Sequence, residues 1–99
     1  MKNIISDINK NFESRIRLGI MSILIINDWV EFNTFKSVLN VTDGNLASHI
    51  KALEKGNYIE VKKQFLGNKP NTSYRITKEG KTAFNLHLDA LENFLKNKQ

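Results

Sequence analysis

The sequence has no cysteine, one proline and no long hydrophobic run in its 99 residues. Without thiols it can form neither a disulfide nor a thiolate metal site. The longest apolar run, residues 23–26, is far too short to cross a bilayer. The first residues lack the apolar segment of a signal peptide. We therefore expect a soluble, cytoplasmic protein without membrane association.

The sequence also lacks the residue patterns of common enzymes. Its two histidines, His49 and His87, fall on different predicted helices, and neither has a carboxylate partner at the spacing of a metal site or proton relay. Asp89 and Glu92 near His87 fit an exposed helical face. Each of the five glycines stands alone, so there is no glycine-rich phosphate loop. We expect no enzymatic activity, no metal and no cofactor.

Positive charge is concentrated in the middle of the chain. The net charge is +5, and residues 41–81 hold eight basic side chains against four acidic ones. This length suits one domain, 1–99, with a single core. A basic excess in one region favours a polyanionic partner such as nucleic acid.

The most informative segment, residues 42–55, predicts a helix with one apolar face. Leu46, Ile50 and Leu53 recur at helical spacing. Thr42 or Asp43 is suited to cap its start, and a left-handed glycine at position 56 to end it. The opposite face is polar, small and mildly basic, which suits a DNA major groove. An ordinary amphipathic helix with a solvated face fits the segment about equally well.

The flanking segments predict a helix-turn-helix within an α+β domain. Residues 13–26 form a first helix, residues 29–32 an edge strand and residues 35–39 a short helix capped by Asn33 or Thr34. After Gly56 the period changes to two, predicting a β-hairpin over 59–76 with Ile59, Val61 and Phe65 on one face. Residues 67–71 look too turn-rich for a strand, so we expect a long basic tip. A last helix covers 78–96.

This order of elements is that of a winged helix with a two- to three-stranded antiparallel sheet. Two runs of residues resemble small regulators related to the multiple-antibiotic-resistance repressor (MarR) family. The first run is Thr42-x-Gly44-Asn45-Leu46-x-Ser48-His49-Ile50-x-x-Leu53-Glu54-x-x-x-Tyr58-Ile59. The second run is Lys62-Lys63-x-Phe65-x-Gly67-x-Lys69-Pro70-x-Thr72-x-Tyr74-x-Ile76-Thr77-x-x-Gly80. The resemblance extends from Arg17 to about Leu95. It implies a homodimeric, sequence-specific regulator of transcription that binds double-stranded DNA.

In that family the recognition helix enters the major groove, the hairpin wing contacts backbone or minor groove, and terminal helices form the dimer. By this resemblance, residues 43–55 form the recognition helix, and residues 1–12 and 78–99 are dimerisation segments. The apolar residues that we assign to the dimer are Ile4, Ile8, Leu88, Leu91, Phe94 and Leu95. Larger relatives hold a ligand pocket for which this chain has little length, and the sequence names no small-molecule effector.

Asn45 and Ser48 are the best candidates to read bases, because an amide bridges two groups on adenine and a hydroxyl is adaptable. His49 is a third candidate, and a half-buried histidine bonded to backbone fits that position equally well. Phosphate contacts are expected from side chains on the helix and the wing, namely Thr42, Lys51, Lys55, Lys62, Lys63, Lys69 and Arg75. Two alternatives remain. Thr42 could act only as a helix cap, and the lysines of the wing could only protect its exposed strand edge from aggregation.

The main rival function is a winged helix used only for protein–protein contact. Its recognition face would be apolar or acidic and its wing neutral, whereas this face is polar and this wing basic. RNA binding ranks last, because base stacking needs exposed aromatic side chains and Tyr58 and Tyr74 are expected in the core.

Overall fold

The computed structural model describes residues 7–96. Its elements in chain order are the 3₁₀ helix η2 (Lys10–Phe12), α1 (Arg15–Ile25), β1 (Val30–Glu31), α2 (Phe32–Leu39), α3 (Asp43–Lys55), β2 (Ile59–Leu66), β3 (Lys69–Ile76) and α4 (Lys78–Lys96). The three strands form one antiparallel sheet in the order β1-β3-β2. This is a winged helix-turn-helix, so the predicted α+β fold class is confirmed.

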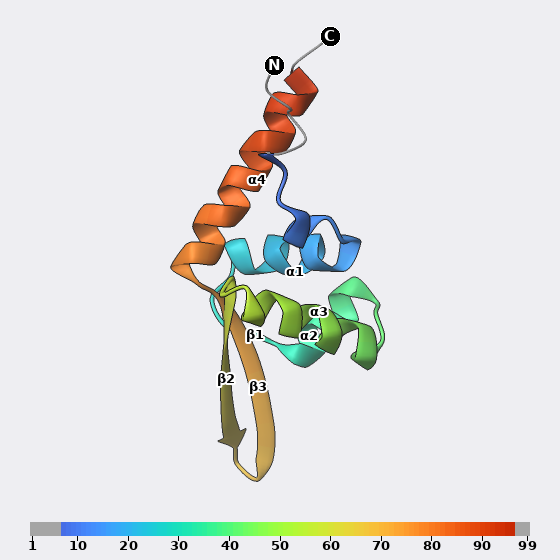
Figure 1. Ribbon diagram of the computed structural model, residues 1–99. Helices are drawn as coiled ribbons and strands as arrows, with labels where there is room; N and C mark the ends of the chain where they lie inside the picture. The colour runs from blue at the N-terminus through green and yellow to red at the C-terminus, as the bar shows by residue number, and fades with distance from the viewer. Residues whose placement is uncertain (1–6, 97–99) are drawn as a thin grey trace.

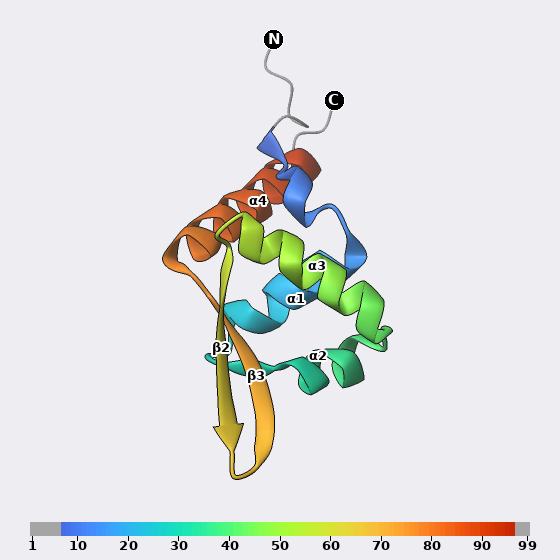
Figure 2. The same cartoon turned by 60° about the horizontal axis from the view of Figure 1, so that its bottom comes forward.

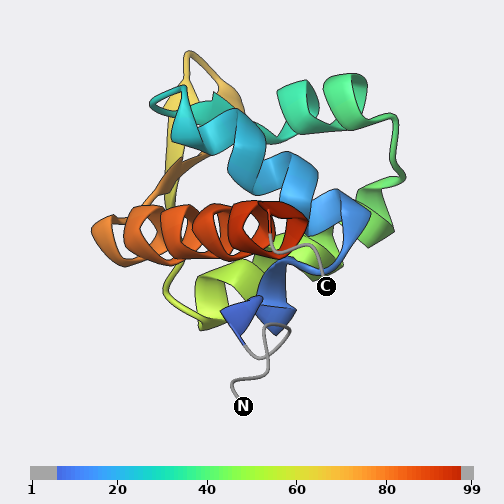
Figure 3. The same cartoon turned by 90° about the horizontal axis from the view of Figure 1, so that it is seen from above.

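The elements are arranged along one direction. Figure 1 shows α4 at one end of the molecule, the hairpin tip at the opposite end, and α1, α2 and α3 between them. Seen from above in Figure 3, α4 crosses α1. This arrangement leaves α2, α3 and the hairpin on the side away from α4.

The core lies where α1, α3 and the base of the hairpin meet. Ile20, Met21 and Leu24 of α1 are fully buried, because each recurs on the helix face that points inward. They pack with apolar residues from every other element, namely Phe12, Val30, Phe35, Leu46, Ile50, Leu53, Ile59, Tyr74, Ile76 and Phe84. Gly19 lets α1 approach α2, since a Cβ there would lie 2.7 Å from Leu39 Cδ2.

Helix α2 begins earlier than the sequence indicated. It starts at Phe32, directly after β1, and its N-cap Glu31 makes no side-chain capping bond, so the predicted caps Asn33 and Thr34 lie inside the helix. Burial of Phe35 against the core stabilises this first turn without a cap. The helix ends at Asn40, whose left-handed φ of 52° turns the chain toward α3.

Helix α3 begins and ends where the sequence predicts, at Asp43 and Lys55, and differs only in the conformation of the glycine that follows it. The Thr42 hydroxyl accepts a hydrogen bond from the Asn45 backbone N–H at 3.2 Å, which confirms the predicted cap. Gly56, expected in the left-handed conformation, has a φ of −82°. Asn57 adopts the left-handed conformation instead, with a φ of 62°. Position 56 requires glycine for space, because a Cβ there would lie 2.6 Å from the Tyr58 ring.

The predicted long tip of the hairpin is wrong. Only Gly67 and Asn68 lie outside the strands, and Gly67 has a φ of 65°, as a two-residue hairpin turn requires. Pro70 pairs with Phe65, where its missing N–H points away from β2 toward an edge that β1 does not reach. A proline is therefore compatible with β3. The strands run past the core, so Phe65, predicted on the same face as Ile59 and Val61, is 71% exposed.

The first half of α4 packs on the core through one narrow face. Gly80, Phe84, His87 and Ala90 are buried along it. Asp89 and Glu92 are exposed, as predicted, whereas the neighbouring His87 is 3% exposed, and its Nδ1 accepts a hydrogen bond from the Asn9 backbone N–H at 3.1 Å. Its ring also lies edge-on to Phe12. The amino-terminal segment before α1 therefore covers the histidine, an interaction that helical periodicity does not predict.

Candidate nucleic-acid interface

The outer face of α3 is an open polar surface. Asn45 and Ser48 are exposed, and within the described residues neither side chain has a hydrogen-bond partner. Lys51 and Lys55 are also exposed, and Figure 2 shows α3 passing in front of α1. Because Leu46, Ile50 and Leu53 pack the other face against the core, the helix that carries these polar groups has a fixed position.

The start of α3 is held to α2 by an ion pair. Lys36 Nζ lies 2.5 Å from Asp43 Oδ1, which is 72% exposed. An unpaired carboxylate at this place would repel a phosphate, and Lys36 offsets that charge. The exposed Thr42 hydroxyl serves as the cap described above, and its own proton stays available for a further hydrogen bond.

His49 is half-buried on the flank of α3, next to α1. Its Nδ1 accepts a hydrogen bond from Nε of Arg17 at 2.9 Å. Burial lowers the pKa of His49, and the positive charge of Arg17 lowers it further. The expected alternative of a backbone hydrogen bond is therefore replaced by a side-chain partner on another helix. Sequence reasoning missed Arg17, because no local pattern shows which residues of α1 will meet α3.

The basic side chains of the wing fall into two groups. Lys63 and Lys69 are exposed on the outer part of the hairpin, and neither has a partner among residues 7–96. Lys62 Nζ lies 4.3 Å from the centre of the Trp29 ring, a cation–π contact. By the strand register, Lys63 is on the same sheet face as the core residues Tyr74 and Ile76, and Lys62 is on the other.

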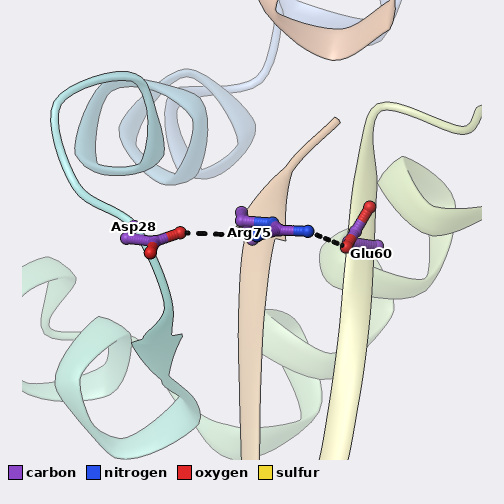
Figure 4. A network of polar contacts seen from close by, with 3 residues as sticks. All are labelled: Asp28, Glu60 and Arg75. Atoms are coloured by element: carbon purple, nitrogen blue, oxygen red, sulfur yellow. Dashed lines mark hydrogen bonds and ion pairs between the residues drawn. The ribbon is translucent and has the colours of Figure 1, made fainter. Parts of the chain in front are cut away.

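Arg75 is at the base of the wing, within a network of side chains. Its guanidinium lies 2.7 Å from Glu60 and 3.8 Å from Asp28, as Figure 4 shows, and 4.5 Å from the centre of the Trp29 ring. These contacts favour a structural role for Arg75 over the phosphate contact expected from its charge. Trp29, a residue that the sequence did not single out, joins this network through both Lys62 and Arg75.

The second half of α4 continues the buried face of its first half beyond the core. Leu91 is half-buried, whereas Leu88 is 41% exposed, Phe94 42% and Leu95 80%. These side chains lie within about 60° of the Gly80–Phe84 face at 100° per residue. Of the other residues assigned to a dimer, Ile8 is half-buried, and Ile4 lies outside the described residues.

Between residues 7 and 96, no three histidine, aspartate or glutamate side chains are grouped so that they could hold a metal ion. In the same range, no helix has the length and hydropathy needed to cross a membrane.

Residues 16–95 match the family model of a winged helix DNA-binding domain. The chain is 36% identical over 88 residues to an uncharacterized protein of Methanocaldococcus jannaschii. The matched segment covers 89% of this chain and 96% of that protein. A solved structure of a transcriptional regulator homologue from Pyrococcus horikoshii OT3 is 30% identical, with a TM-score of 0.80 over 87% of this chain and 85% of that one.

The same fold occurs in structures of the MarR family. A structure described as a MarR-family transcriptional regulator from Enterococcus faecalis V583 covers 94% of this chain and 79% of its own, with a TM-score of 0.70 and 20% identity. At that identity the likeness concerns the fold, and it agrees with the resemblance drawn from the sequence.

Proposed function

The chain belongs to the winged helix DNA-binding domain family, and we propose on that premise that it is a homodimeric regulator of transcription that binds specific sites on duplex DNA. Helix α3 enters the major groove, and the wing (residues 59–76) contacts the backbone or the minor groove. The exposed, unpaired side chains on the outer face of α3 are the observation that carries this proposal.

Asn45 and Ser48 are proposed to read base edges. A free amide offers a donor and an acceptor together, as recognition of adenine in the major groove requires, and a free hydroxyl adapts to either kind of base atom. Asn45 lies in the first turn of α3 and Ser48 in the second, the part of a recognition helix that reaches the bases. His49, one turn beyond Asn45, is a third reader.

The free lysines are proposed to supply affinity through phosphate contacts. Lys51 and Lys55 extend from α3, and Lys63 and Lys69 from the wing. Lysine is a flexible point charge, well suited to phosphate oxygens and poorly suited to choosing among bases. Thr42 adds a hydroxyl at the helix start. Lys62 and Arg75 act mainly by fixing the wing against Trp29.

A second copy of the chain is proposed to cover the exposed part of α4. Leu88, Phe94 and Leu95 extend an apolar face past the core, and in the described residues nothing covers them. Pairing two such faces would bury them and place the two α3 helices on the side of the dimer away from α4. Two recognition helices about 34 Å apart would match a two-fold-symmetric DNA site.

One observation favours the alternative of a protein-binding module. Phe65 and Leu66 are 71% and 56% exposed at the hairpin tip, and exposed apolar groups are common at protein interfaces. Under that alternative the tip would bind a partner protein, and the free lysines around it would have no phosphate to meet.

Selection from a randomised duplex library, followed by electrophoretic mobility shift, tests the proposal. The wild-type chain should enrich a symmetric site and should retard random fragments weakly at low salt. Asn45→Ala with Ser48→Ala should remove the preference for the enriched site and keep the weak binding. The matched control is Thr82→Ala with Asn93→Ala, two exposed polar residues of α4. No retardation by the wild type at low salt would refute the DNA role.

A further inference from the structure

The hydrogen bond between Arg17 and His49 joins α1 to the recognition helix. Both side chains are half-buried, and the Nε–Nδ1 distance is 2.9 Å. Elsewhere α1 faces α3 with apolar residues such as Ile20 and Leu24. A directed polar contact at the edge of an apolar interface fixes one side chain in one orientation, and His49 lies at the margin of the surface proposed to meet DNA.

We propose that Arg17 is a positioning residue that makes His49 a hydrogen-bond donor toward DNA. This inference rests on the proposed function and adds a specificity-determining pair to it. Arg17 acts through the ring of His49, and His49 makes the contact with the duplex.

The chemistry of imidazole gives this result. A neutral histidine carries its single proton on one nitrogen and accepts on the other. Because Nδ1 accepts from the Arg17 Nε–H, the proton of His49 resides on Nε2. A second proton would remove the acceptor and place a positive charge beside the guanidinium. The lowered pKa of His49, caused by burial and by Arg17, agrees with a neutral ring.

A fixed donor narrows what His49 can recognise. In the major groove it can bind the acceptors N7 of purines, O6 of guanine and O4 of thymine. It cannot serve the amino groups of adenine and cytosine, which need an acceptor. His49 follows Asn45 by one helical turn, so a base pair next to the one read by Asn45 is the expected contact. Asn45 is exposed and His49 half-buried, which gives His49 a shorter reach toward the bases.

The charge of Arg17 has no carboxylate to neutralise it within residues 7–96. A simple electrostatic role for Arg17 must therefore be separated from the positioning role. Arg15, an exposed cation on the same helix turn, provides that control, because no interaction joins it to α3 in the described residues. Loss of either arginine removes one positive charge, and only loss of Arg17 removes the bond to His49.

The first test examines the pair without DNA. Long-range ¹H–¹⁵N spectra of the labelled protein should show an unprotonated His49 Nδ1 and a protonated Nε2 at neutral pH. Arg17→Met keeps most of the alkyl stem and removes the donor, and in this variant the Nδ1 resonance should move. A protonated Nδ1 in the wild type, or an Nδ1 resonance that Arg17→Met leaves in place, would overturn the inference.

The second test measures base discrimination. Binding of the selected site and of its single-base-pair variants is compared for Arg17→Met, His49→Phe, the double variant and Arg15→Met, with thermal melts to confirm folding. Arg17→Met and His49→Phe should each reduce discrimination at the same base pair, about five- to tenfold. The double variant should lose no more than His49→Phe alone. Arg15→Met should weaken all sites equally.

Three results of the second test would reject the inference. Arg17→Met could weaken all sites equally, as expected for Arg15→Met; the losses in the double variant could add; or the two single variants could affect different base pairs. If the wild type selects no site at all, the proposed function fails together with the DNA role of the pair. If selection succeeds and Arg17→Met keeps full discrimination, only this inference fails.

Discussion

Neighbouring lysines of the wing should differ in how they contribute to the salt dependence of DNA binding. Lys62 and Lys63 carry the same charge on adjacent residues of β2, and their side chains point to opposite faces of the sheet. Lys63 has no partner among residues 7–96, whereas the ammonium of Lys62 lies 4.3 Å from the centre of the Trp29 ring. Replacing each by glutamine therefore compares a lysine that is available for a phosphate with a lysine that already contacts the Trp29 ring.

The size of the effect follows from counterion release. The logarithm of affinity falls with the logarithm of salt concentration by about 0.9 for each phosphate neutralised. With the four free lysines Lys51, Lys55, Lys63 and Lys69 on each of two protomers, the slope should be about −7. Lys63→Gln removes one contact from each protomer and should make the slope shallower by about 1.8.

Fluorescence anisotropy of a labelled duplex, titrated at several salt concentrations, measures these slopes. Lys62→Gln should change the slope by less than half as much as Lys63→Gln does, and it should shift the emission of Trp29, the only tryptophan. Lys81→Gln on α4 is the control for a change in net charge. Equal changes of slope for Lys62→Gln and Lys63→Gln would refute the idea that the contact with Trp29 keeps Lys62 from binding phosphate as Lys63 does. A slope unaffected by Lys63→Gln would refute the role of the wing in phosphate contact.

Three further predictions concern assembly and stability. Leu95→Glu puts a charge on the exposed end of the apolar face of α4 and should turn the proposed dimer into a monomer in sedimentation velocity. The control Leu86→Glu should leave sedimentation unchanged, because Leu86 is 63% exposed on the opposite side of α4. Unchanged sedimentation of Leu95→Glu would place the dimer contact elsewhere. Burial lowers the pKa of His87 below its ordinary 6.5, although the nearby carboxylate of Glu13 acts in the other direction. As the pH falls through 6.5, the unfolded chain therefore binds more protons than the folded chain, and the folded state loses stability. Thermal melts from pH 8 to pH 5 should show this decline, and His87→Gln should show less of it; an equal decline would assign the effect to other groups. Gly80→Ala forces a Cβ against the backbone carbonyl of Tyr58 and should lower the free energy of unfolding by about 3 kcal/mol in chemical denaturation. The control Gly44→Ala meets open space and should raise the free energy of unfolding by about 0.5 kcal/mol. Equal stabilities of the two variants would refute the close approach of α4.

Much of the fold is determined by local sequence patterns. The apolar spacing of Leu46, Ile50 and Leu53, with a threonine cap before it, requires few distant contacts to specify α3, and the prediction of its start is correct. The same holds for the hairpin, where period-two alternation on both sides of a glycine defines two paired strands. The order of these elements was sufficient to recognise the winged helix.

Errors arose where an end or a partner depends on distant residues. The start of α2 depends on β1 pairing with β3 and on burial of Phe35, neither of which is local. Pro70 was taken as a strand breaker because the sequence does not show which edge of β3 is open. The burial of His87 was not predicted, because the segment that covers it lies 78 residues earlier in the chain.

For the candidate interface, the sequence by itself determined the identity of the polar and basic residues and their places on one helix and one hairpin. Tertiary structure alone decided which of them are free to act. It paired Arg75 with Glu60 and Asp28, placed Lys62 on Trp29 and gave His49 a partner in Arg17. The physical reason is that helical and strand periodicity fixes the direction of a side chain relative to its own element, whereas the charge or ring that it meets depends on how separate elements pack.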